Sequence, residues 1–126
     1  MAHEIRILRL AGDQPFAQAV DEVDEALRQA RADGVGRLLV DIRGLTGFAS
    51  PDLFARISMV RRWASTAKGQ VRVAMVARPD LMDGERFGVV VARSMGFDGD
   101  VFEHEEDALY WLEQTPSLWV GPPPEF

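Results

Sequence analysis

The segment between Arg37 and Asp52 constrains the fold of this chain more than any other. It opens with an unbroken apolar run within Arg37–Ile42, which is typical of a central strand covered on both faces. A loop with two glycines follows, and Ser50 and Pro51 then carry the signals of a helix start. This order of strand, loop and helix predicts an α/β protein, in which ligands gather at the carboxyl ends of the strands.

The alternation continues along the chain. The apolar spacing predicts strands over residues 5–10, 37–42, 71–77 and 100–103, and helices from Asp13 to before Gly34, from Ser50 to about Lys68, from Asp83 to Gly96, and from Glu103 or His104 onward. We therefore expect one α/β domain over residues 1–114, with about four strands in a mixed or largely parallel sheet interleaved with about four helices. Residues 115–126 contain three consecutive prolines and are expected to form a proline-rich C-terminal tail.

Composition argues against most catalytic chemistry. The chain of 126 residues has no cysteine, which excludes disulfides, zinc–thiolate sites and thiol catalysis. Its two histidines, His3 and His104, are not accompanied by a Gly-x-Ser-x-Gly turn, so a catalytic triad is not expected. The acidic residues around His104 lack a regular metal-ligand spacing. We expect no enzyme activity, no metal site and no cofactor.

The lengths of the apolar segments and the pattern of the N-terminus give an expectation about the cellular setting. No apolar stretch approaches the roughly 20 residues that cross a bilayer, and the N-terminus has no basic region followed by an apolar run. We expect a cytoplasmic protein with no membrane insertion and no nucleic-acid partner.

The net charge of −6 is unevenly distributed. Residues 37–93 carry ten basic and five acidic side chains, whereas residues 94–126 carry eight acidic and no basic ones. Lys68 is the one lysine among 14 basic residues, and arginine favours bidentate contact with carboxylate or phosphate. Two interpretations are open: the arginines form a solvated face, or the basic middle meets an acidic partner or the acidic end of another copy.

A candidate binding site lies where two neighbouring strands end. The loop of Gly44 and Gly47 follows one strand, but it lacks the Gly-Lys-Ser/Thr ending of a phosphate-binding P-loop. Arg43 and Arg78 follow neighbouring strands, at the edge where helix starts offer free amides to anions. We expect a small anionic or lipid-like ligand at loops 43–50 and 78–83, held by Arg43, Gly44, Gly47, Ser50 and Arg78. In the alternative, Asp41, Asp52 or Asp80 neutralises both guanidinium groups and the site is a salt-bridge network.

Apolar side chains outside the predicted core favour self-association. Met59 and Trp63 lie at the margin of an already full helix stripe, and the tail carries Leu118 and Trp119. Exposed aromatic area of this kind marks interfaces, and a two-fold dimer is the commonest closed form. We expect a homodimer with contacts at these four residues.

Several of these segments together resemble a known family. Asp41, the Gly44–Gly47 loop, the Ser50 helix start, the Ala74–Pro79 strand end, Phe87-Gly88 and the final helix around residues 108–112 look like a STAS-type domain. The likeness covers roughly residues 4–113 and is closest to the bacterial branch described as STAS or CRAL-TRIO-like. It implies a non-catalytic protein-interaction or regulatory module with a protein partner.

The same resemblance directs attention to Ser50. In anti-sigma-factor antagonists, a serine at the start of the corresponding helix is phosphorylated by a kinase partner, and Ser50 resembles that serine. Ala49 and Pro51-Asp52 depart from the family's Asp-Ser-Ser-Gly pattern around it. The alternative role of Ser50 is that of an N-cap, whose hydroxyl accepts a hydrogen bond from the first turn of the helix.

Overall fold

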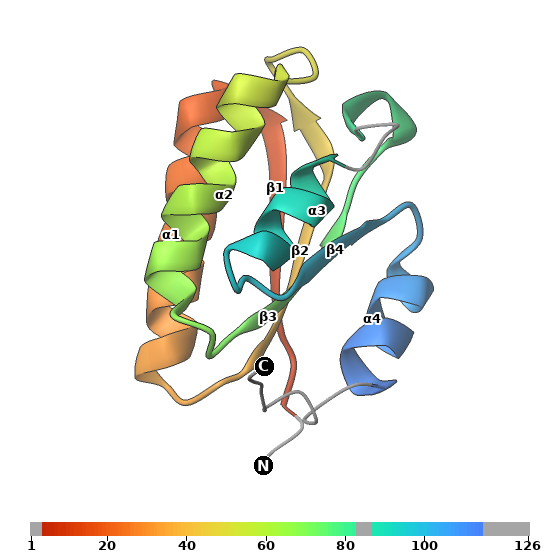
Figure 1. The fold of residues 1–126 in the computed structure, drawn as a ribbon. Helices are drawn as coiled ribbons and strands as arrows, with labels where there is room; N and C mark the ends of the chain where they lie inside the picture. The colour runs from red at the N-terminus through yellow and green to blue at the C-terminus, as the bar shows by residue number, and fades with distance from the viewer. Residues whose placement is uncertain (1–3, 83–86, 115–126) are drawn as a thin grey trace.

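All strands of the sheet run parallel and lie in the order in which the chain makes them (Figure 1). The computed structural model describes residues 4–82 and 87–114. Within these residues, the strands are β1 (Arg6–Asp13), β2 (Arg37–Thr46), β3 (Arg72–Val76) and β4 (Gly99–Phe102). The predicted α/β class with a parallel sheet is confirmed. The expected proline-rich tail lies outside the described residues.

The helices divide unequally between the two faces of the sheet. They are α1 (Phe16–Ala32), α2 (Leu53–Ala67), α3 (Phe87–Ser94) and α4 (Glu105–Gln114), with a short 3₁₀ turn, η1, at Pro79–Leu81. Crossovers that all advance in one direction place their helices on one face, and α1, α2 and α3 share such a face. The α4 helix follows the edge strand β4 and covers the opposite face (Figure 1).

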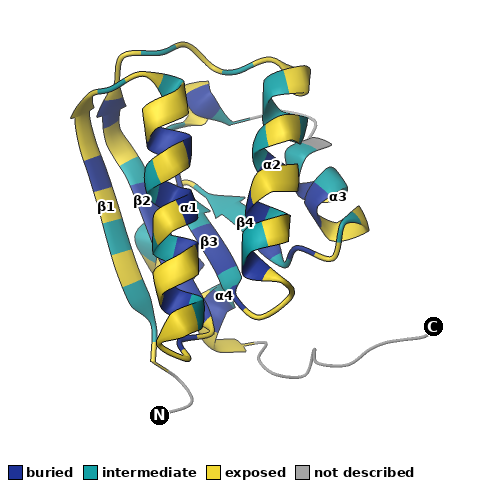
Figure 2. Cartoon of the chain, turned by 90° about the vertical axis from the view of Figure 1, so that its left-hand side faces the viewer, coloured by how far each residue is buried: buried dark blue, intermediate teal, exposed yellow. Residues whose placement is uncertain are grey.

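This arrangement explains the unbroken apolar run in β2. Leu38 and Val40 belong to the larger core beneath α1, α2 and α3, whereas Leu39 belongs to the smaller core beneath α4. All three side chains are 0% exposed, because the strand is covered on both sides. Figure 2 shows the buried residues concentrated along β2, β3 and the inner sides of the helices.

The ends of β1 and β2 approach closely at two glycines, Gly44 within β2 and Gly47 just after it. A Cβ built at Gly44 would lie 2.9 Å from the Ala11 Cβ, next to a register shift between the strands. Gly47 has a φ of 103°, and a Cβ there would lie 2.5 Å from the Gln14 carbonyl oxygen. Both glycines therefore allow β2 and its loop to pack closely against the end of β1.

The helix starts differ from the predicted ones. The α1 helix begins at Phe16 with Pro15 as its N-cap, not near Asp13. The prediction that Ser50 caps the next helix is wrong, because α2 begins at Leu53 and the Asp52 carboxylate accepts a hydrogen bond from the Ala55 amide at 2.8 Å. The predicted third helix start at Asp83 lies outside the described residues.

Candidate functional site

The structure brings Arg43 and Arg78 to the same edge of the sheet, although β2 extends to Thr46 and so includes Arg43, which was predicted to follow the strand. The Arg78 Nη1 donates hydrogen bonds to the carbonyl oxygens of Arg43 and Leu45, at 2.9 and 2.7 Å. Its Nε and Nη2 face the carboxylate of Asp80, at 3.1 and 3.4 Å. This arginine is therefore used to hold the end of β2 against the turn that follows β3.

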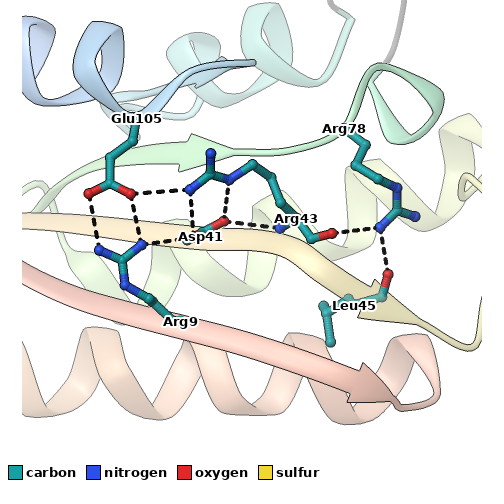
Figure 3. A network of polar contacts seen from close by, with 6 residues as sticks. All are labelled: Arg9, Asp41, Arg43, Leu45, Arg78 and Glu105. Atoms are coloured by element: carbon teal, nitrogen blue, oxygen red, sulfur yellow. Dashed lines mark hydrogen bonds and ion pairs between the residues drawn. The ribbon is translucent and has the colours of Figure 1, made fainter.

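Arg43 belongs to a four-residue ion network with Arg9, Asp41 and Glu105 (Figure 3). Its Nε and Nη2 contact the two carboxylate oxygens of Asp41, at 2.9 and 3.0 Å. Arg9 reaches Asp41 at 2.8 Å and both oxygens of Glu105, at 2.7 and 3.0 Å. Arg43 also contacts Glu105, at 3.2 Å. Two cations and two anions thus join β1, β2 and the first turn of α4.

The network shifts the titration of its members in the direction that ion pairing requires. The Arg43 guanidinium, which donates to the carboxylate, lowers the pKa of Asp41 to about 2. The hydrogen bond from Arg9 likewise lowers the pKa of the Glu105 carboxyl. In return, Glu105 raises the pKa of Arg9, and Asp41 raises that of Arg43. The charges of the network are therefore stabilised by one another.

These pairings match the second of the two arrangements that the sequence left open. Arg43 and Arg78 both face carboxylates, those of Asp41 and Asp80, as in the salt-bridge alternative. Nothing in the sequence singled out Arg9 or Glu105 as members, because the contact between them joins residues 96 apart in the chain.

A different feature of the same edge involves Ser50. Its exposed hydroxyl accepts a hydrogen bond from Nη2 of Arg56 at 2.6 Å. Arg56 lies in the first turns of α2 and also donates to the carbonyl oxygens of Pro51, at 3.0 Å, and Leu81, at 3.1 Å. One guanidinium therefore connects the loop before α2 with the turn after β3. The sequence did not distinguish Arg56 from the other arginines, because this role depends on two loops meeting in space.

Arg56 also lines an apolar cavity between the sheet and its helices, which we call the helix-side cavity. Its volume is about 130 Å³. The α2 helix packs mainly on α1 and α3, and the cavity extends beneath these helices over β3 and β4. Among the described residues, the charged ones in its lining are Arg56 and Asp100, and the rest is almost entirely apolar, including Val20, Phe48, Val60, Met75, Leu81 and Ala92.

The lining of the helix-side cavity includes residues of the predicted ligand loops, but not the residues that were predicted to hold the ligand. From loops 43–50 and 78–83 it takes the apolar residues Leu45, Phe48, Leu81 and Met82. None of the predicted anion-binding residues (Arg43, Gly44, Gly47, Ser50 and Arg78) is part of its lining.

The expected exposure of Trp63 is wrong. Its side chain is 4% exposed, and its indole N–H donates to the Val20 carbonyl at 3.2 Å, so it belongs to the core between α1 and α2. Met59 is half-buried and lines the cavity. Leu118 and Trp119 lie outside the described residues. Among the described residues, the large apolar side chains that are exposed were not predicted: Ile7, Leu53, Phe54, Val90 and Tyr110.

No group of three or more acidic or histidine side chains in residues 4–82 and 87–114 is placed to hold a metal ion. Among the helices of that same part of the chain, none combines the length and apolar character needed to cross a bilayer.

Comparisons with known proteins found no match: no family model, no curated protein and no solved structure matches the chain.

Proposed function

We propose that this protein is a non-catalytic binding module that takes a small apolar molecule into the helix-side cavity. The cavity itself carries the proposal: about 130 Å³ of space lined by apolar side chains from α1, α2, α3 and three strands. The space is partly open to solvent, which gives a ligand a way in. An engineered apolar cavity of roughly 150 Å³ in another protein binds benzene, so a space of this size is large enough for a small apolar molecule.

The position of the cavity also supports binding. Its lining includes half-buried side chains, such as Met75 and Val101 on the strands and Met82 beyond η1. Because these side chains are covered only in part, a ligand can replace water against them. Apolar lining with few polar groups is the usual character of small-molecule pockets.

A cavity-filling substitution tests the proposal. Ala92 is 4% exposed on α3 and lines the cavity, so Ala92→Leu places additional carbon atoms in the ligand's space. The matched control is Ala17→Leu, on the exposed side of α1 and outside the lining. Binding of 1-octanol is followed by amide chemical shifts in two-dimensional NMR, which also report that each variant is folded.

We expect the wild type and Ala17→Leu to bind with the same affinity and Ala92→Leu to bind at least about tenfold more weakly. Val60→Ile, which adds a single methylene to the same lining, should give an intermediate loss. Shifts that map away from the cavity, or equal binding by a folded Ala92→Leu variant, would contradict the proposal.

A second candidate function follows from the STAS resemblance: a cytoplasmic bacterial regulatory module that acts through a protein partner or as a homodimer. One observation favours it. Phe54, in the first turn of α2, is 77% exposed and follows the exposed Ser50 by four residues, so an apolar side chain and a hydroxyl are both exposed around the start of this helix. Such a surface is typical of an interaction site.

Self-association through this surface can be measured directly. Light scattering at roughly tens of micromolar, where modest affinities register, should give a dimer for the wild type and a monomer for Phe54→Ser. Val90→Ser, at another exposed apolar residue, is the control. A wild-type monomer would remove the homodimer, and a dimer that persists in Phe54→Ser would remove Phe54 from its interface.

A further inference from the structure

Arg56 differs from the other arginines at this edge of the sheet in the groups it contacts. Arg43 and Arg78 each contact a carboxylate, whereas the hydrogen bonds of Arg56 all go to neutral oxygens, on Ser50, Pro51 and Leu81. Within residues 4–82 and 87–114, Arg56 makes no ion pair. Its positive charge is therefore held in place by the loops, and no side chain in the described part of the chain neutralises it.

The guanidinium also keeps part of its donor capacity. An arginine has five N–H groups, and the contacts of Arg56 use Nε and Nη2. Nη1 donates to none of the described residues. It is also not a buried nitrogen that lacks a partner, because the one buried side-chain atom without a hydrogen bond in that part of the chain is Oε1 of Gln14. Nη1 is thus available for a hydrogen bond to a further group.

The surroundings of Arg56 specify what that group should be. Arg56 lines the helix-side cavity, and the other charged residue of the lining, Asp100, is paired with Arg93 at 3.5 Å. Among the described residues, the cavity thus joins an apolar space to a cation, Arg56, that has no ion-pair partner and keeps one donor nitrogen available. An apolar chain that ends in an oxyanion complements both parts, because charge-assisted hydrogen bonds to arginine are stronger than neutral ones.

We propose that the ligand of the helix-side cavity is a short amphiphile with an acidic head, a carboxylate or phosphate monoester, whose apolar chain fills the cavity and whose head binds Arg56. This inference rests on the proposed ligand-binding function and adds the chemical class of the ligand. The loops that Arg56 already connects position its guanidinium before the ligand arrives, which reduces the entropy lost on binding.

The test compares three ligands with the same eight-carbon chain: octanoate, octyl phosphate and neutral 1-octanol. Isothermal titration calorimetry at fixed ionic strength measures each affinity. We expect the wild type to bind at least one of the two anions about tenfold or more tightly than 1-octanol, since a hydrogen bond to a charged group commonly contributes that much. The two anionic arms distinguish a carboxylate from a phosphate head.

Three variants locate the preference. Arg56→Gln should bind the anions no better than 1-octanol, while Arg56→Lys should retain part of the preference. The control Arg61→Gln removes the same charge from an exposed position further along α2, outside the lining, and should behave as the wild type. If Arg56→Gln no longer binds 1-octanol because the loops have separated, the affinity of Arg56→Lys for the anions relative to 1-octanol decides whether the inference holds.

Each contrary outcome has a distinct meaning. Equal binding of all three ligands by the wild type, or an anion preference that survives in Arg56→Gln, overturns this inference but leaves the proposed function intact. No preference in a folded Arg56→Lys variant, after a complete loss in Arg56→Gln, also overturns it. Failure of the wild type to bind any of the three ligands overturns the proposed function and this inference with it.

Discussion

Replacing Asp41 with asparagine should remove most of the acid sensitivity that the ion network gives to this fold. Asp41 is 8% exposed and contacts both Arg9 and Arg43, and its Oδ1 also accepts from the Arg43 backbone amide at 3.0 Å. Asparagine has nearly the same volume and keeps an acceptor oxygen for that amide. The substitution therefore removes the charge and leaves the local packing in place.

The magnitude follows from the titration of this carboxyl. Its pKa falls from 3.8 to about 2, and at about 1.4 kcal/mol per pH unit this sets an upper value of about 2.5 kcal/mol. The partner side chains of Arg9 and Arg43 are 51% and 41% exposed, so solvent screens part of the attraction. We expect Asp41→Asn to lower the free energy of unfolding by about 1–2 kcal/mol near neutral pH.

The contribution of Asp41 to the free energy of unfolding is present at neutral pH and is lost in acid. Because folding lowers the pKa of Asp41, its contribution is complete above about pH 4 and is lost as the pH falls towards 2. Urea unfolding at several pH values should show that the free energies of unfolding of wild type and Asp41→Asn converge near pH 2.

The control for this experiment is Asp33→Asn, which removes the exposed ion pair with Arg6 and should change stability by less than about 1 kcal/mol at any pH. A deficit of Asp41→Asn that is the same at neutral and at acid pH would refute the reasoning, because the lost free energy would then not come from the charge.

Three further predictions concern local structure, and urea unfolding measures each. Asp52→Ala should cost about 0.5–2 kcal/mol because it removes the N-cap of α2, whereas Ser50→Ala should cost clearly less; equal losses would contradict the assignment of the cap. Trp63→Ala should cost about 3–5 kcal/mol because the side chain is buried, and a loss below about 1 kcal/mol would place it at the surface. Gly47→Ala should destabilise more than Gly34→Ala, since both have positive φ but a Cβ at Gly47 also meets the Gln14 backbone; the reverse order would contradict the close approach.

The fold class could be predicted from the sequence because it depends on local patterns. The unbroken apolar run of Leu38, Leu39 and Val40 indicated a strand buried on both faces, and the three- and four-residue spacing in α1 indicated a helix with one apolar stripe. Helix starts were less predictable. Ser50 and Asp52 are both good N-caps. In the structure Asp52 caps the helix, whereas the Ser50 hydroxyl accepts from Arg56, a contact that the local sequence pattern does not reveal.

The candidate site was located only in part. The sequence indicated the correct edge of the sheet, because parallel strands end together, and it named Asp41 and Asp80 among the groups that could neutralise Arg43 and Arg78. It did not indicate the helix-side cavity. A cavity depends on how far α2 and α3 stand from the sheet, and no residue pattern records that distance. The error over Trp63 has the same origin, since its burial depends on the neighbouring α1.

The consecutive order of the strands has a consequence for how the chain folds. Each strand pairs with its immediate predecessor, so each pairing closes a segment of roughly 25–35 residues, and the entropy of closing such segments is similar. No described strand has to wait for a partner from the far end of the chain. Contacts of this moderate sequence separation favour faster folding than long-range strand pairings do. The β1–α1–β2 unit can form first, and each later helix and strand can then add to an existing edge while the chain is still being synthesised.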